Sequence, residues 1–133
     1  MANFVYNGGK KALLEGQVNW LTDNIRAILI DRAFYTPSAA HATLADVMPQ
    51  ARVAVSGTLT ARTTANGVAG SSGASFTALP NVSVEALAIV KVTGVDSTST
   101  LICFIDTALG LPVSPSTNGN GSVTWANNQI FSL

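Results

Sequence analysis

The chain has little charge, and this shortage is its clearest compositional feature. Asp, Glu, Lys and Arg make up only 11% of its 133 residues. A soluble globular domain usually contains about 25% of these residues. Because charge keeps a freely diffusing monomer in solution, the shortage predicts that other protein chains cover part of the surface.

Other absences exclude whole classes of protein. The seven basic and seven acidic residues balance, and apart from Lys10 and Lys11 they are scattered. The basic stripe that a nucleic-acid-binding protein needs is therefore missing. The longest apolar run, Val84 to Val92, contains two charged residues and is too short for a membrane span. The first residues lack a basic region followed by a long apolar stretch, so we expect no signal peptide.

The chain has one cysteine, Cys103, which cannot form an internal disulfide. This is typical of a protein that assembles in a reducing cytoplasm. A chain of this length buries enough surface to fold without disulfides or a metal. Its composition is uniform, so we expect a single domain over residues 1–133, with an N-terminal arm and helix in residues 1–16.

The first third of the chain predicts two short helices and one strand. A helix is expected over Asn7–Glu15, ending at Gly16. The apolar, isoleucine-rich run Asn24–Asp31 has the length of a strand. Thr36-Pro37 resembles a helix cap followed by a proline, which predicts a second helix through His41–Met48.

From Arg52 onward, apolar and polar residues alternate with a period of two, which is typical of half-buried strands. Asn66-Gly67 predicts a tight turn, and Gly70–Gly73 a flexible loop. A longer loop is expected from Pro112 through the run Asn118–Gly121. The expected strands are Val53–Val55, Leu59–Thr63, Ser75–Leu79, Val84–Val92, Leu101–Ile105, Val123–Trp125 and Gln129–Leu133.

This pattern predicts a mainly β fold. Seven or eight short strands at regular spacing indicate a single-domain antiparallel β-sandwich or jelly-roll-like barrel, with one or two short helices near the N-terminus. We expect Ile28, Ile89, Ile102 and Phe104 to be buried in one sandwich.

The sequence contains few residues that could carry catalysis, and we predict no catalytic, cofactor-binding or metal site. His41 is the only histidine, and its sequence neighbours Ala40, Ala42 and Thr43 carry no acidic or basic group. Cys103 lies in an apolar run without a basic residue to lower the pKa of its thiol. Gly8-Gly9-Lys10-Lys11 lacks the glycine spacing of a phosphate-binding loop. Without a signal peptide, Asn81-Val82-Ser83 is a chance match to a glycosylation site.

The remaining candidates favour structural roles. The carboxylates form no metal-binding or catalytic motif, although folding could still bring two of them together as in a glycosidase. Threonine-rich strands suit either a solvated face or a carbohydrate-binding face, and the solvated face is the simpler interpretation. Trp20 and Trp125 are too far apart in sequence to argue for a sugar platform, so burial or interface anchoring is expected.

Several segments together resemble a known family. They are NIRAILID, Phe34-Tyr35-Thr36-Pro37, Ala51-Arg52-Val53-Ala54, the block from Glu85 to Pro115, and WANNQIFSL at the end. Their order resembles small structural proteins encoded in tailed-phage and prophage gene clusters, over nearly the whole chain. That family has no catalytic motif. Its C-terminal Trp-Asp appears here as Trp125-Ala126, so any role of that acid is absent.

The resemblance implies a non-enzymatic virion protein, with two possible roles. One is a capsid decoration (cement) protein that stabilises contacts between major capsid subunits on the capsid surface, after assembly in the bacterial host cytoplasm. The other is a tail component or surface adhesin that binds a host receptor or glycan. We expect a homo-oligomer, a trimer, that binds the major capsid protein but neither nucleic acid nor membrane. The segment through Tyr6 and the C-terminal strand ending in Leu133 are the expected contacts with neighbouring chains.

Overall fold

The computed structural model describes residues 4–76, 84–106, 121–125 and 128–132. Residues 1–3 of the expected arm, residues 77–79 of an expected strand and Leu133 lie outside these ranges, and two predicted features do so as a whole. They are the loop around Pro112 and Pro115, and the Asn81-Val82-Ser83 sequence. No helix within the described ranges has the length and apolar character of a membrane span.

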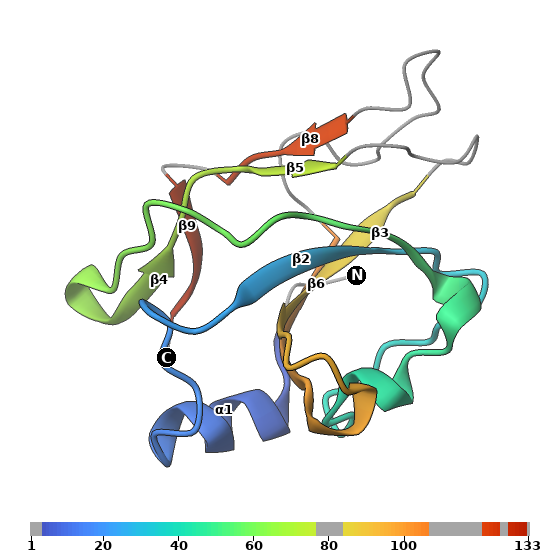
Figure 1. Cartoon of the computed structure of the whole chain (residues 1–133), viewed down its shortest axis with the longest axis horizontal. Coiled ribbons are helices and arrows are strands. Elements are labelled where there is room, and N and C mark those ends of the chain that lie inside the picture. The colour runs from blue at the N-terminus through green and yellow to red at the C-terminus, as the bar shows by residue number, and fades with distance from the viewer. Residues whose placement is uncertain (1–3, 77–83, 107–120, 126–127, 133) are drawn as a thin grey trace.

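The fold is mainly β, and its centre is a five-stranded antiparallel sheet (Figure 1). The strand order is β1-β7-β6-β2-β3. These strands are β1 (Phe4–Val5), β2 (Ile25–Ile30), β3 (Arg52–Val55), β6 (Ala86–Lys91) and β7 (Thr100–Ile105). The predictions for the strands at Asn24–Asp31, Val84–Val92 and Leu101–Ile105 are confirmed to within two residues at each end.

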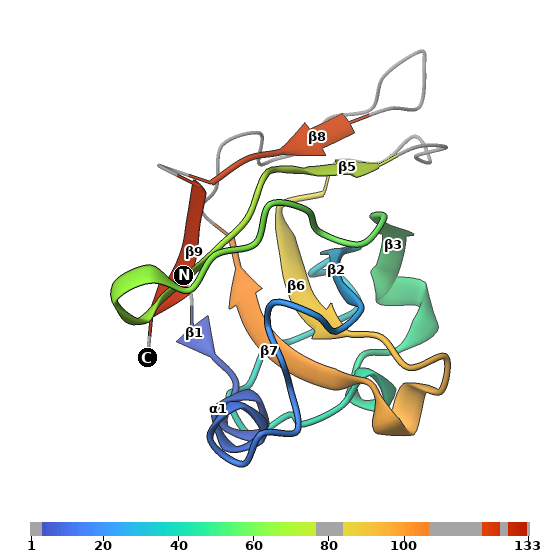
Figure 2. The ribbon, with the colours of Figure 1, turned by 60° about the vertical axis from the view of Figure 1, so that its left-hand side comes forward.

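Two smaller antiparallel ribbons lie on one side of this sheet (Figure 2). In one ribbon β4 (Val68–Gly70) pairs with β9 (Gln129–Ser132). In the other, β5 (Ala74–Phe76) pairs with β8 (Gly121–Val123). Although β8 and β9 are consecutive, each pairs with an earlier strand. Each ribbon thus contains one strand from the C-terminal end of the chain. Together the two ribbons cover one face of the sheet as a second layer.

The sheet separates two apolar clusters, because strand side chains alternate between its faces. Leu87 and Ile89 of β6 belong to one cluster with the ribbons and α1, whereas Ala88 and Val90 belong to the other. Both faces of β6 are therefore covered. The predicted core residues Ile28, Ile89, Ile102 and Phe104 are all buried. They are divided between the clusters: Ile89 and Ile102 lie on the ribbon side, and Ile28 and Phe104 on the opposite side.

The single α-helix in the described ranges, α1 (Asn7–Leu14), packs across β7 and confirms the predicted N-terminal helix. It ends where Gly16 takes a φ of 75°, a conformation that favours glycine. Gly9 faces the sheet, and a Cβ at this position would lie 2.7 Å from the carbonyl oxygen of Ile102. Gly9 thus lowers helix propensity but lets the helix approach the sheet backbone closely.

The predicted helix over His41–Met48 is wrong. The chain instead forms two short 3-10 turns, η1 (Leu44–Asp46) and η2 (Pro49–Ala51). The Asp46 carboxylate accepts hydrogen bonds from the backbone N–H groups of Ala42 and Thr43, at 2.8 and 3.2 Å. These bonds cap a single turn at Thr43, seven residues after the expected cap at Thr36. Two further 3-10 turns, η3 (Ala65–Gly67) and η4 (Asp96–Thr98), lie in later connections.

Two predictions in the middle of the chain also need correction. The expected strand Leu59–Thr63 does not form, because Ala61 takes a φ of 50° that interrupts extended backbone. The expected flexible loop Gly70–Gly73 is partly ordered, since Gly70 belongs to β4 and Ser71 is buried. The turn at Asn66-Gly67 is confirmed, with φ angles of 56° and 75°.

Candidate functional site

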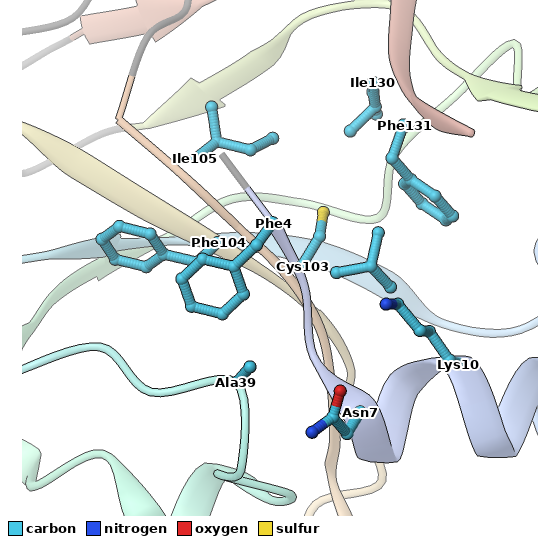
Figure 3. A pocket seen from close by; sticks show the side chains of 10 residues that line it. Phe4, Asn7, Lys10, Ala39, Cys103, Phe104, Ile105, Ile130 and Phe131 are labelled. Atoms are coloured by element: carbon cyan, nitrogen blue, oxygen red, sulfur yellow. The ribbon is translucent and has the colours of Figure 1, made fainter. Parts of the chain in front are cut away.

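A cleft of about 440 Å³ lies where β1, the start of α1 and β9 meet (Figure 3). Cavities of this size are typical of binding sites for small molecules and peptide segments. Ten residues line it: Phe4, Val5, Asn7, Lys10, Ala39, Cys103, Phe104, Ile105, Ile130 and Phe131. Seven of the ten side chains are apolar aliphatic or aromatic groups, so the cleft favours an apolar ligand.

The cleft lies at an open edge of the sheet. Phe4 and Phe104 pack with the cluster on one face, whereas Val5, Cys103 and Ile105 pack with the cluster on the other. A hollow that contacts both faces must pass around the edge of the sheet. That edge is β1, which pairs only with β7 among the described strands.

Two polar side chains from the first turn of α1 line the cleft, Asn7 and Lys10 (Figure 3). Lys10 is exposed, and no ion pair involving it occurs within the described residues. The ammonium group of its neighbour Lys11, in contrast, lies 3.5 Å from the Glu15 carboxylate. Counting only the described residues, the cleft therefore contains one cationic group without a carboxylate partner.

Cys103 contributes to the cleft wall but is not available for chemistry. Its side chain is buried, and this burial raises the pKa of the thiol well above its ordinary value. A protonated, buried thiol is a poor nucleophile. The expectation that Cys103 is a small core residue agrees with this geometry.

His41 belongs to a row of hydrogen-bonded side chains. The Tyr35 hydroxyl lies 2.7 Å from Nδ1 of His41 and 2.9 Å from the hydroxyl of Tyr6. Burial raises the pKa of both phenols, so neither ionises readily. His41 thus has an orienting partner that its sequence neighbours did not reveal. The row nevertheless contains no group that His41 could activate as a nucleophile.

The carboxylates that the structure describes mostly serve local structure. Four of them lie within 4.0 Å of a basic side chain: Glu15 with Lys11, Asp23 with Lys91, Asp96 with Arg52, and Asp106 with Arg32. The Asp23 pKa is lowered, chiefly because its carboxylate accepts a backbone hydrogen bond from Asn19. Within the described ranges, no group of three or more metal-ligating side chains occurs.

Both tryptophans are buried and hydrogen-bond to one short segment. Trp20 Nε1 donates to the carbonyl of Gly70 at 3.1 Å. Trp125 Nε1 donates to the Ser71 hydroxyl at 3.2 Å and to the Ser72 carbonyl at 3.1 Å. The prediction of burial rather than a sugar-binding surface is confirmed for both side chains. Together they hold the residues that connect the two ribbons.

Gly8-Gly9-Lys10-Lys11 is part of α1 itself, so these residues form no phosphate-binding loop. Sequence reasoning missed the cleft, because its walls come from segments about 100 residues apart. The one available signal was the apolar character of Phe4-Val5 and Ile130-Phe131 near the two ends of the chain. No local pattern connects Tyr6 with Tyr35 and His41.

Comparison of the sequence with models of known protein families gives no match, and comparison with curated proteins gives none either. The chain's own cleft, charge and surface are therefore the basis for a functional proposal.

Proposed function

We propose that this protein is a non-enzymatic structural component of a tailed-phage virion, a capsid decoration protein that stabilises contacts between major capsid subunits. The observation that carries the proposal is a set of exposed apolar side chains in a chain with few charged residues. Six large apolar side chains are exposed in the described ranges: Leu14, Leu21, Phe34, Met48, Val55 and Val95. The most exposed, Leu14, retains 81% of its accessible surface.

Isolated exposed apolar residues are common on soluble proteins. Here they coincide with a charge content of 11%, so fewer charged groups than usual surround them. A protein that spends its working life in contact with other subunits can present such a surface, because assembly removes the apolar area from water. The sequence resemblance to small virion proteins supplies the biological setting of the proposal.

A decoration protein would act by mass action. A ligand that binds only the assembled shell stabilises that shell by a free energy that grows with the logarithm of its concentration relative to its dissociation constant. A trimer suits this role, because capsid lattices present three-fold positions where each copy can contact a different capsomer. The apolar surface would then be divided between contacts among the copies and contacts with the shell.

The test is the copy number of this protein in purified virions, measured on a stained gel against the major capsid band. Hundreds of copies per particle are expected for a decoration protein. Virions lacking the protein should release DNA at a lower temperature and under milder osmotic shock than wild type. A few copies per particle, with unchanged stability and failed adsorption to cells, would instead identify a tail component or adhesin.

A further inference from the structure

Among the described strands, none pairs with the outer edge of β1. Tyr6 N–H donates to the carbonyl of Ile102 at 2.9 Å, and the register pairs Val5 with Cys103. Antiparallel ladders alternate between hydrogen-bonded and non-hydrogen-bonded pairs. Val5 therefore occupies a non-hydrogen-bonded position, and its N–H and C=O groups point away from β7.

The next outward position along the chain is already filled. Asn7 N–H donates to the Ala39 carbonyl at 2.9 Å, so the chain itself satisfies the edge at this point. No hydrogen bond from the described residues reaches the outward groups of Val5. Within the described part of the chain, one donor and one acceptor thus remain for an added strand beside Val5.

The cleft supplies the other requirements of strand addition. An added strand projects alternate side chains to the two faces of the sheet. At this edge each face offers an apolar wall, with Phe4 and Phe104 on one side and Ile105, Ile130 and Phe131 on the other. The position of Lys10 in the lining adds a single positive charge, which complements a carboxylate.

We infer that the cleft is a strand-addition site for an extended segment of a partner chain, with apolar side chains on both faces and a carboxylate opposite Lys10. The inference deepens the proposed function, on which it rests for the source of the segment, a neighbouring shell subunit. It also changes the expected N-terminal contact. Phe4–Tyr6 belong to the chain's own sheet, so the contact is made by the outer edge of β1 rather than by a free arm.

The probe is the blocked hexapeptide Val-Val-Thr-Val-Val-Glu, which places valines on both faces of the added strand, compared with the same peptide ending in glutamine. Each is titrated into the ¹⁵N-labelled full chain, and backbone amide shifts are followed by NMR. The amides of Val5 and Lys10 should move with the glutamate peptide. The glutamine peptide should bind about two- to fivefold more weakly, as expected for an exposed ion pair.

Two variants test the separate parts of the site. Val5→Pro removes the outward N–H without removing a bond to β7, and it should reduce peptide binding by at least about tenfold. Val5→Thr keeps the N–H and should bind normally. Lys10→Gln should abolish the preference for glutamate over glutamine, whereas Lys11→Gln should retain it because Lys11 faces Glu15.

Melting curves of Val5→Pro and Lys10→Gln show whether each variant folds. If Val5→Pro does not fold, Lys10→Gln still tests the inference. The inference would be overturned if the amide shifts of Val5 and Lys10 did not change on addition of peptide. Equal binding of the glutamate peptide by Lys10→Gln and wild type would overturn it too. So would self-association without peptide that Val5→Pro abolishes, because the occupant would then be a second copy. If the peptide binds as expected but purified virions lack the protein, the cleft remains a binding site and the proposed function is rejected.

Discussion

The Tyr35 hydroxyl lies 2.7 Å from Nδ1 of His41. This contact determines which group donates and which accepts in each hydrogen bond of the row Tyr6, Tyr35 and His41. Tyr6 has a fully buried side chain, and its hydroxyl bonds to that of Tyr35. If Tyr6 donates to Tyr35 and Tyr35 donates to Nδ1, both hydroxyl protons have an acceptor. The reverse direction would leave the Tyr6 proton unpaired in an apolar core, which is costly. Nδ1 is therefore the acceptor.

This arrangement predicts that neutral His41 carries its proton on Nε2. The imidazole ¹⁵N shifts should show this tautomer in the wild-type protein, and Tyr35→Phe should remove the preference. A dominant Nδ1–H tautomer in wild type would contradict the proton direction.

The same row predicts unequal effects of removing its two hydroxyls. Tyr35→Phe leaves the Tyr6 hydroxyl buried without a partner, so it should lower the free energy of unfolding by about 1–3 kcal/mol. Tyr6→Phe leaves the bond between Tyr35 and His41 intact and should cost about 1 kcal/mol or less. Chemical denaturation measures both. The double variant should be no less stable than Tyr35→Phe alone; a strictly additive loss would argue against this coupling.

Gly9→Ala tests the close approach of α1 to β7. Alanine favours helix by about 1 kcal/mol over glycine. Its Cβ would nevertheless meet backbone atoms of Leu101 and Ile102 at 2.7–2.9 Å, and these atoms cannot rotate away. We expect a net loss of about 1–3 kcal/mol in the free energy of unfolding. Gly8→Ala is the matched control. A Cβ at position 8 would lie no closer than 3.3 Å to Ala42, so the loss of stability should be much smaller.

Phe104→Ala should be among the most destabilising changes in the core. The ring is fully buried and stacks on Phe4, with ring centroids 5.5 Å apart. Its removal should lower the free energy of unfolding by about 3–5 kcal/mol. Phe34→Ala serves as a control, since Phe34 is exposed and should change stability by only about 0.5 kcal/mol. A loss below about 1 kcal/mol for Phe104→Ala would show that this core is misplaced.

Asp46 should make the η1 cap dependent on pH. Its backbone hydrogen bonds from Ala42 and Thr43 lower the pKa of the carboxyl below its ordinary value of 3.8. The stabilisation is therefore fully present above that ordinary pKa and is lost as pH falls through the lower folded-state pKa. Asp46→Asn should be slightly less stable than wild type at neutral pH, and the difference should disappear in acid. Unfolding curves across this range measure it, and a difference that persists in acid would contradict the charge dependence.

Local features of the fold could be predicted because neighbouring residues determine them. Gly16 ends a helix and Asn66-Gly67 forms a turn because these residues tolerate positive φ. The alternation in Val84–Val92 identified a strand, and the structure covers that strand on both faces. The expected helix at His41–Met48 failed because Asp46 bonds the backbone of Ala42 and Thr43, a choice that propensity alone does not reveal.

The sequence by itself determined that the chain is mainly β, where most of its strands lie and that it contains few charged residues. These properties follow from periodicity and composition, which are local or additive. Only the tertiary structure decided that β8 and β9 pair with β5 and β4, that Tyr6 contacts Tyr35, and that β1 pairs with β7 alone among the described strands. Such contacts join residues far apart in the chain, and their free energy depends on how whole segments pack. No short stretch of sequence contains that information.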